Sequence, residues 1–371
     1  MCVYRPAGRS LPDRKGQKDM RYPKALREQG TIGVTAPSFG CVTEPYKSAF
    51  VNAQRQLAQR GFSVKVGETC GLAEGIGISS TPQRCARELT QFMTDPACDV
   101  VLSAGGGEMM CEVISRMDFD ALAAADPKWF MGFSDNTNMT YLLATACDTA
   151  SVYGPNAPAF GMKPWHPVLD QALELLMGTR DRVTGFDLWE KEGLKDEQHP
   201  LEPYHLTEPK ILHRLDAENG QVVECGMQDE PVRFQGRMLG GCLDCLANLA
   251  GTRWDYTAEF MERYPGEKVV WFLEACDYNP MDIRRAIWRL GQTGWFDQTA
   301  GFLIGRPGCY GVNWFGLDHY HAFTDLLQEY QVPVILDVDL GHLPPSMPIL
   351  CGATGHVEIR DAQISVTYEK N

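Results

Sequence analysis

The sequence of 371 residues has no long apolar run, no excess of basic residues and no regular pattern of cysteines. No apolar stretch approaches the roughly 20 residues that a helix needs to cross a bilayer, so we expect no membrane partner. The net charge of −14 argues against a nucleic-acid partner, whose binding surface would be basic. The charge by itself selects no substrate.

The 13 cysteines are odd in number and scattered, mostly within apolar segments. A disulfide framework would show regular spacing in a smaller chain, so this usage favours reduced thiols and a cytoplasmic location. Cys242 and Cys245 form one CxxC pair, but no second pair or histidine cluster completes a metal site. We therefore expect both thiols to pack in an amphipathic helix, with no metal and no cofactor. A metal or redox role of this pair is the alternative.

The length of the chain predicts two domains. Residues 1–30 are interpreted as an N-terminal extension, because their basic first part lacks the apolar core of a secretory signal. Residues 31–160 are predicted to form a first α/β domain, and residues 161–204, rich in proline and charge, a linker. Residues 205–371 are predicted to form a second α/β domain.

Strands alternate with helices in the first predicted domain, which indicates a parallel sheet with helical crossovers. In such sheets ligands bind at the carboxyl ends of the strands. The segments TAPSFG, AGGGE and FSDN all follow predicted strands directly. In the second predicted domain, short strands at 222–225 and 231–234 precede a glycine pair, Gly240-Gly241, that leads into a helix.

The segment KWFMGFSDNTN, residues 128–138, places Ser134 where an apolar strand turns into a helix. A side chain at such a turn points outward, and the free N–H groups of the helix face whatever binds there. Gly132 removes a Cβ from a crowded corner. This is the geometry of a nucleophile elbow, although Asn136 stands where the second glycine of G-x-S-x-G would be. The alternative is that Ser134 or Asp135 only caps the helix.

The run AGGGE, residues 104–108, follows another predicted strand. It matches neither the dinucleotide fingerprint nor the P-loop. Three uses stay open: a phosphate cradle, an oxyanion hole, or a plain tight turn.

Two more polar side chains end apolar strands: Glu274 closes KVVWFLE and His342 closes VILDVDLGH. Taken singly, each has an ordinary structural explanation. Together with Ser134 they would supply a nucleophile, a base and an orienting acid. A serine hydroxyl becomes an effective nucleophile when a neutral imidazole takes its proton, and a buried carboxylate holds that imidazole in the right tautomer.

The order of these segments resembles the LD-carboxypeptidases (muramoyltetrapeptide carboxypeptidases) and the related microcin C immunity proteins, which are serine peptidases. The resemblance covers about Ile32 to Gly355 and is carried by TIGVTAPS, SAGGGE, FMGFSDNT, GRMLGGCLDCLANLAGT, VVWFLEACDYNPMDIRRAIWRLGQTGWFDQTAGFLIG and DLGHLPPSMPILCG. It implies an α/β fold with an N-terminal glutaminase-like, flavodoxin-like parallel-sheet domain and a C-terminal mixed β/α domain. It further implies an active site in the interdomain cleft, a homodimer, no metal and a cytoplasmic location.

The resemblance also implies roles for single residues. The nucleophile of the family falls on Ser134, its triad glutamate on Glu274 and its triad histidine on His342. The activity implied is hydrolysis of an amide bond in a small peptide, with release of a terminal D-amino acid from a muropeptide. A catalytically silent ligand-binding relative is an alternative from another class.

The oxyanion hole of the family would come from the backbone N–H of Asp135 and of Gly105 or Gly106, with Gly106 favoured. Many peptidoglycan-recycling members carry an arginine just before the glycine pair, where this chain has Ala104. That departure favours the immunity-type branch, which hydrolyses a peptidyl- or aminoacyl-nucleotide. Members of that branch stack an aromatic residue on the nucleobase, and Trp165 and Trp189 are the candidates here. Packing of these tryptophans on a neighbouring domain is the alternative.

Overall fold

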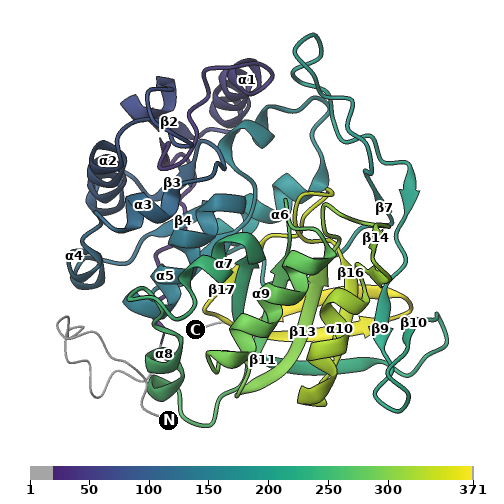
Figure 1. Ribbon diagram of the computed structural model, residues 1–371. Helices are drawn as coiled ribbons and strands as arrows, with labels where there is room; N and C mark the ends of the chain where they lie inside the picture. Colours follow the sequence, from purple (N-terminus) through teal and green to yellow (C-terminus); the bar gives the residue numbers. More distant parts are fainter. Residues whose placement is uncertain (1–19, 370–371) are drawn as a thin grey trace.

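The computed structural model describes residues 20–369 and contains two large sheets that lie side by side (Figure 1). The six-stranded sheet has the order β17-β5-β4-β3-β1-β2, in which only β17 runs antiparallel to its neighbour. Its strands are β1 (Thr31–Thr35), β2 (Ser63–Val66), β3 (Val100–Ser103), β4 (Trp129–Gly132), β5 (Ser151–Tyr153) and β17 (Ile349–Cys351). All side chains of β3 and β4 are buried, as expected for a parallel sheet that is covered on its faces.

In this half, α2 starts at the capping residue and the proline that the sequence predicts for a helix start. Thr81 caps α2 by accepting a hydrogen bond from the backbone N–H of Arg84, and Pro82 occupies the first turn. The helices are α1 (Tyr46–Gln59), α2 (Pro82–Thr94), α3 (Met110–Ile114), α4 (Phe119–Ala124), α5 (Thr137–Cys147) and α6 (Pro167–Leu176), with 3-10 turns η1 (Glu68–Gly71), η2 (Ser134–Asn136) and η3 (Ala157–Gly161).

The nine-stranded sheet is mixed and has the order β10-β9-β16-β13-β12-β11-β18-β19-β6. Its parallel centre consists of β11 (Val232–Cys242), β12 (Val269–Glu274), β13 (Thr299–Gly305) and β16 (Val334–Val338). Antiparallel strands flank this centre: β6 (Arg182–Thr184), β9 (His213–Leu215), β10 (Val222–Glu224), β18 (Thr354–Arg360) and β19 (Gln363–Tyr368). The fold class predicted from the sequence, a parallel-sheet α/β domain followed by a mixed β/α domain, is therefore confirmed.

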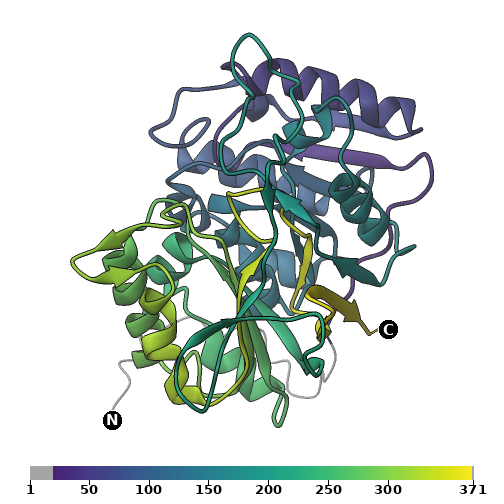
Figure 2. The same cartoon turned by 90° about the vertical axis from the view of Figure 1, so that its right-hand side faces the viewer.

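Helices and two small ribbons complete the second half (Figure 2). A capping box between Asn279 and Asp282 starts α9, with Pro280 in its first turn. The helices are α7 (Leu243–Leu249), α8 (Thr257–Arg263), α9 (Pro280–Gln292) and α10 (His321–Leu327), followed by the turn η4 (Gln328–Tyr330). The ribbons are β7 (Leu188–Trp189) with β8 (Glu208–Pro209), and β14 (Asn313–Trp314) with β15 (Leu317–Asp318). None of the described helices combines the length and apolar character needed to cross a membrane.

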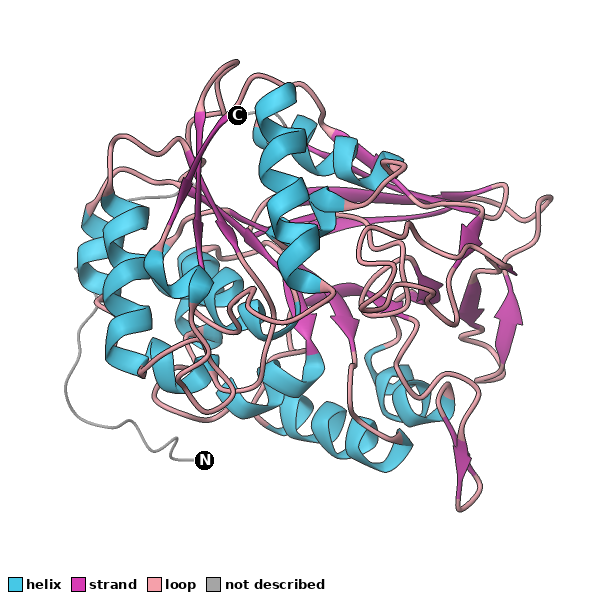
Figure 3. Cartoon of the chain, turned by 90° about the horizontal axis from the view of Figure 1, so that it is seen from above, coloured by secondary structure: helices cyan, strands magenta, loops and turns pink. Residues whose placement is uncertain are grey.

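Seen from above, helices lie against the strands in both halves of the molecule (Figure 3). Helix α5 follows the short turn η2 that begins at Ser134, and it packs against elements of both halves. All 11 of its residues are buried, as expected for a helix that is apolar on all sides. Tyr141 stacks on Trp295 of the second half at a centroid distance of 5.0 Å, and Thr137 Oγ1 accepts the backbone N–H of Cys242 at 2.9 Å. The turn that carries Ser134 is thus anchored on a helix packed between the two sheets.

One predicted boundary in the second half is wrong. The glycine pair Gly240-Gly241 does not lie between a strand and a helix but inside β11, which is 11 residues long. A Cβ on Gly240 would lie 1.8 Å from the carbonyl oxygen of Phe272. The strand therefore continues because glycine allows the backbone to approach its neighbour this closely, at a φ of 151°.

The expected N-terminal extension and linker do not stand apart from the two sheets. Residues 1–19 lie outside the described residues, but the described part, 20–30, packs on the first half. The backbone of Arg21 pairs with Asp148 and Ala150, and Leu26 is buried. Within the expected linker, β6 joins the nine-stranded sheet, whereas β17, from the expected second domain, joins the six-stranded sheet. The division at residues 160 and 204 stays a prediction.

Candidate active site

Ser134 lies on a sharp and strained turn between β4 and α5. Its φ of 63° is a left-handed conformation that costs a non-glycine residue on the order of 1–3 kcal/mol. A Cβ on Gly132 would lie 2.9 Å from the side chain of Asn136 and 3.0 Å from that of Ser103, which explains the glycine. Asn136, in place of the second glycine of the elbow motif, donates to the carbonyl oxygens of Gly105 at 2.8 Å and Phe133 at 3.0 Å. The amide thus ties the elbow to the glycine loop.

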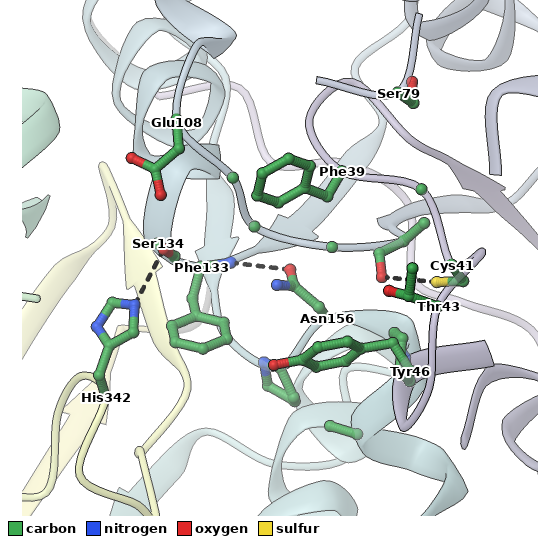
Figure 4. A pocket seen from close by; sticks show the side chains of 18 of the residues that line it. Phe39, Cys41, Thr43, Tyr46, Ser79, Glu108, Phe133, Ser134, Asn156 and His342 are labelled. Carbon is green, nitrogen blue, oxygen red and sulfur yellow. Dashed lines mark hydrogen bonds between the residues drawn. The ribbon is translucent and has the colours of Figure 1, made fainter. Parts of the chain in front are cut away.

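The structure brings the three predicted polar side chains together, and Figure 4 shows two of them, Ser134 and His342, facing each other. Ser134 Oγ lies 2.9 Å from Nε2 of His342, and Nδ1 of His342 lies 2.8 Å from Oε2 of Glu274. The arrangement fits an imidazole that donates its Nδ1–H to the carboxylate and accepts the serine proton at Nε2. The residue at the cap position of α5 is Asn136, and the carboxylate of Asp135 accepts from Ser38, the backbone of Met110 and the side chain of Asn138 rather than from a backbone N–H of α5, so the structure does not support the capping alternative.

Charge and burial act against each other in the pair of His342 and Glu274. Burial lowers the pKa of His342, but the charge of Glu274 and hydrogen bonds with Cys276 and Glu274 outweigh it and leave that pKa well above its usual value. Burial raises the pKa of Glu274, and the charge and hydrogen bond of His342, with hydrogen bonds from Tyr153 and Cys242, bring it below its usual value. Each group therefore stabilises the charged form of the other.

Tyr153 connects Ser134 with Glu274 across the two halves. Its hydroxyl donates to Oε1 of Glu274 at 2.6 Å and accepts the backbone N–H of Ser134 at 3.1 Å. Burial and the charge of Glu274 raise the pKa of this phenol well above its usual value, so it stays a neutral donor. Tyr153 thus fixes one oxygen of the carboxylate while His342 uses the other.

Two backbone N–H groups next to Ser134 are free to bind a ligand. Among the described residues, no hydrogen bond uses the N–H of Asp135 or of Gly106. Gly106 lies directly against the nucleophile, because a Cβ added there would be 3.1 Å from Ser134 Oγ. The N–H of Gly105 also makes no hydrogen bond among the described residues, and the carbonyl oxygens of both glycines are used: that of Gly105 accepts from Ser103 and Asn136, that of Gly106 from the backbone N–H of Phe39. The contact with Ser134 Oγ therefore favours Gly106 over Gly105 as a donor toward an oxyanion.

The carboxylate of Asp135 braces this corner. It accepts the hydroxyl of Ser38 at 2.5 Å and the backbone N–H of Met110 at 2.9 Å, at the start of α3. Burial raises the pKa of this carboxyl, although hydrogen bonds from Ser38, Met110 and Asn138 oppose the shift. The side chain therefore holds the elbow, the first loop and α3 together while the N–H of Asp135 faces the site.

A cavity of about 740 Å³ opens in front of Ser134 and His342. It is lined by residues of both predicted domains and of the segment between them, which agrees with a site in a cleft between the two halves. The lining is mainly apolar and includes four aromatic side chains, namely Phe39, Tyr46, Phe133 and Tyr204. Its volume is in the range of pockets that enclose drug-sized ligands.

Neither predicted tryptophan is among the residues that line this cavity, and the expectation that one of them contacts a ligand stays a prediction. Trp189 is buried; it packs on Tyr310 and donates from Nε1 to the carbonyl oxygen of Pro209. Trp165 lies under the guanidinium of Arg60 at 3.5 Å and donates to a neighbouring carboxylate. Both indoles therefore use their faces for packing within the protein, which was the stated alternative.

Cys242 and Cys245 lie behind the elbow. Both are free and buried, and Sγ of Cys245 lies 3.8 Å from the carbonyl oxygen of Ser134. A hydrogen bond with Cys245 and burial raise the pKa of Cys242 well above its usual value. Within residues 20–369, no group of histidine, cysteine and acidic side chains has the arrangement of a metal site. Cys245 lies in α7, but Cys242 is the last residue of β11, so the expectation that both thiols pack in one amphipathic helix is wrong for Cys242.

Sequence reasoning missed several residues that shape the site. Tyr153 ends β5 and Asn156 follows it, so the rule that located Ser134, a polar side chain at the carboxyl end of a parallel strand, would have found both. Asn156 Oδ1 accepts the backbone N–H of Phe133 at 3.2 Å. Lys195 and Tyr204, on the loop between β7 and β8, also line the cavity, and no pattern in that loop signals it.

The fold and the family comparisons define a peptidase built from two α/β domains. Residues 32–154 match the LD-carboxypeptidase N-terminal domain, and residues 235–357 match the LD-carboxypeptidase C-terminal domain. The chain therefore belongs to the LD-carboxypeptidase family, peptidase family S66.

The similar proteins are of two kinds, an immunity protein and putative carboxypeptidases. The chain is 23% identical over 342 residues to the microcin C7 self-immunity protein MccF of Escherichia coli, covering 91% of this chain and 93% of that protein. It is 24% identical over 286 residues to a putative carboxypeptidase of Streptomyces coelicolor, covering 76% of each.

Solved structures of similar fold include two proteins of the immunity type. MccF in complex with glutamyl sulfamoyl guanosine gives a TM-score of 0.74 at 21% identity and covers 94% of this chain and 98% of that one. An MccF-like protein from Bacillus anthracis gives 0.75 at 18% identity and covers 94% and 99%. At these identities the likeness shows the fold alone.

Proposed function

We propose that this protein is a serine hydrolase that cleaves an amide bond in a small peptide substrate, with Ser134 as nucleophile, His342 as general base and acid, and Glu274 as the orienting carboxylate. The observation that carries the proposal is the unbroken chain of contacts from Ser134 Oγ through both nitrogens of His342 to Glu274, at 2.9 and 2.8 Å. Such a chain is what activates a serine hydroxyl.

The proposed reaction has two halves. His342 Nε2 takes the hydroxyl proton as Ser134 Oγ attacks the substrate carbonyl, and the N–H groups of Asp135 and Gly106 donate to the developing oxyanion. The imidazolium then protonates the leaving amine, the C–N bond breaks and an acyl-enzyme forms. Water, deprotonated by His342, hydrolyses the ester and returns the proton to Ser134.

For the substrate, we propose first the reaction after which the family is named, release of a terminal D-amino acid from a muropeptide. Both family domains match, and one relative is a putative carboxypeptidase. A terminal residue of a peptide needs a pocket that lies against the nucleophile, and the cavity lined by Ser134 and His342 suits this requirement.

The second candidate is hydrolysis of a peptidyl- or aminoacyl-nucleotide, as in the immunity-type branch. Structures of MccF with aspartyl sulfamoyl adenosine and of an MccF-like protein from Streptococcus pneumoniae with AMP show ligands of this class in relatives. In this chain the aromatic rings of Phe39, Tyr46 and Tyr204 line the cavity and offer faces to a base. Ala104 is buried and apolar where an arginine would seat an acidic peptide.

Parallel assays separate these candidates and test the proposal. Wild-type protein and the Ser134→Ala variant are incubated with a murein tetrapeptide and with aspartyl sulfamoyl adenosine, and the released amine is quantified. The expected result is hydrolysis of one substrate by the wild type and a loss of about 10⁴-fold or more in kcat for Ser134→Ala. Equal turnover by the two proteins would remove Ser134 as nucleophile, and binding without turnover would favour the silent ligand-binding alternative.

On the family resemblance we further propose a cytoplasmic homodimer. Analytical ultracentrifugation of the full chain checks the oligomer: a single species of twice the chain mass is expected. A single species of the chain mass at micromolar concentration would contradict the proposed dimer.

A further inference from the structure

Lys195 gives the cavity one cationic side chain. Among the described residues that line the cavity, Lys195 is the single lysine or arginine, and it comes from the loop between β7 and β8. The other ionisable groups of the lining include Glu108 and His342. A ligand that enters the cavity therefore meets one ammonium group on a wall that is separate in sequence from the reacting serine.

The ammonium group of Lys195 has no anionic hydrogen-bond or ion-pair partner in the described part of the chain. No ion pair or side-chain hydrogen bond involves Lys195 within residues 20–369. Glu190, the carboxylate whose charge acts on it, accepts the backbone N–H of His205 instead. Burial lowers the pKa of Lys195, and the charge of Glu190 opposes this only in part. A half-buried charge without a partner is costly, and a bound anion would offset that cost.

The distribution of charge restricts where an anion is accepted. Glu108 lies on the same side of the cavity as Ser134 (Figure 4), so it repels an anionic group that approaches the elbow. Ala104, at the start of the glycine loop, is fully buried and carries no charge. Apart from His342, whose ring is hydrogen-bonded to Ser134 and Glu274, Lys195 is the basic side chain that an anion meets in the described part of the cavity lining.

We propose that Lys195 binds an anionic group of the substrate, a carboxylate or a phosphate, and thereby selects substrates that carry this group beyond the bond that is cleaved. This inference rests on the proposed function, because it assigns a recognition group to the same cavity. A free terminal carboxylate of a peptide and the phosphate of a nucleotide share the chemistry that an ammonium group recognises.

The test uses binding, so that it does not depend on turnover. In the full-length Ser134→Ala protein, calorimetry measures Kd for two matched pairs of probes: AMP against adenosine, and N-acetyl-L-lysyl-D-alanine against its C-terminal amide. We expect the anionic member of at least one pair to bind about tenfold or more tightly than its neutral partner, the size of one charge-assisted hydrogen bond. The pair that shows this preference identifies phosphate or carboxylate as the group recognised.

Three further substitutions assign the preference to Lys195. Lys195→Met, which keeps the length but removes the charge, should abolish the preference for the anion and leave the Kd of the neutral probe unchanged. Lys195→Arg should retain the preference. Lys191→Met is the matched control, because Lys191 lies on the same loop but is exposed and outside the cavity lining; it should behave as the parent.

The inference is overturned if neither anion is preferred by the parent protein, or if the preference survives in Lys195→Met. The proposed function is judged separately, by reaction of the wild-type serine with a neutral fluorophosphonate. If the serine reacts but the anionic and neutral probes bind equally tightly, the proposed role of Lys195 is wrong and the proposed hydrolase function stands.

Discussion

Two parts of the site differ in how many hydrogen bonds their polar side chains make. They are the group around Ser134, called here the reaction centre, and the cavity wall that carries Lys195. At the centre, Ser134, His342, Glu274 and Tyr153 are joined by hydrogen bonds of 2.6–3.1 Å, and the carboxylate is 1% exposed. On the wall, Lys195 has no side-chain partner among the described residues. A fully bonded centre keeps its geometry before a ligand arrives, whereas an unpaired wall group is available to choose the ligand. The chemistry and the selectivity of this site are thus carried by separate parts.

The largest fall in kcat is expected when Glu274 of the reaction centre loses its negative charge. Glu274→Gln keeps the shape but cannot hold the imidazole in the correct tautomer, so kcat should fall by about 10³–10⁴-fold with little change in KM. Steady-state kinetics on the substrate identified above provide the measurement. Glu262→Gln, at an exposed position of α8, is the control. A fall of less than tenfold for Glu274→Gln would show that the carboxylate is not part of the centre.

A smaller loss is expected from crowding the oxyanion position. In Gly106→Ala the new Cβ would lie 3.0 Å from Cβ and 3.1 Å from Oγ of Ser134, so the nucleophile or the loop must shift. We expect kcat to fall about 10²–10³-fold, the size seen when one oxyanion donor is lost. Gly71→Ala is the control, because a Cβ there would have nothing within 4 Å. If the two variants had equal kcat, the glycine loop would have no part in the reaction.

Tyr153→Phe sharpens the comparison, since it removes two hydrogen bonds from the centre and none from the wall. The buried carboxylate of Glu274 and the N–H of Ser134 each lose a partner. A hydrogen bond to a charged group contributes about 1.5–3 kcal/mol, so we expect kcat to fall about 10–100-fold with KM nearly unchanged. Stopped assays at saturating substrate measure this effect. If KM increased by this factor and kcat stayed unchanged, Tyr153 would instead be assigned to ligand binding.

The pH dependence follows from the same pair of charges. His342 must be neutral to take a proton, and the charge of Glu274 raises its pKa above the usual value near 6.5. Activity should therefore be low in acid and increase with pH, and the midpoint of kcat/KM should lie above 6.5. In Tyr153→Phe the carboxylate charge is less well compensated, so the midpoint should move to higher pH. A midpoint below 6.5, or a shift downward in Tyr153→Phe, would contradict this account.

The smallest effect is expected for Trp165→Phe. Its indole packs under Arg60 and outside the cavity, so KM should stay within about twofold of the wild-type value while the free energy of unfolding decreases by about 1 kcal/mol. Substrate titration and urea denaturation provide the two measurements. A large increase in KM would bring this tryptophan back into ligand binding.

The sequence predicted the centre better than the wall for a physical reason. Glu274 ends β12, and Ser134 and His342 follow the ends of β4 and β16 by a few residues. Each therefore lies at the carboxyl edge of its sheet, the place where parallel sheets bind ligands. The wall depends on a loop between β7 and β8, where Trp189 turns inward and Lys195 lines the cavity. Neither local propensity nor periodicity determines such a choice.

The wrong prediction at Gly240, which lies inside β11, has the same cause: neighbours in sequence do not determine it. Its role depends on the carbonyl of Phe272, a neighbour 32 residues away, and not on the residues beside it. Tyr153 was missed although it obeys the strand-end rule, because its partner Glu274 lies in the other half of the chain.

Mapping of the serine that reacts with a neutral fluorophosphonate tests the central claim most directly. Intact-mass and peptide analysis of wild type, Ser134→Ala and His342→Ala should show one adduct, on Ser134, in the wild type alone. Labelling of Ser134→Ala at the wild-type rate, or no labelling of the wild type under conditions in which the protein is folded, would contradict the claim that the imidazole activates this hydroxyl.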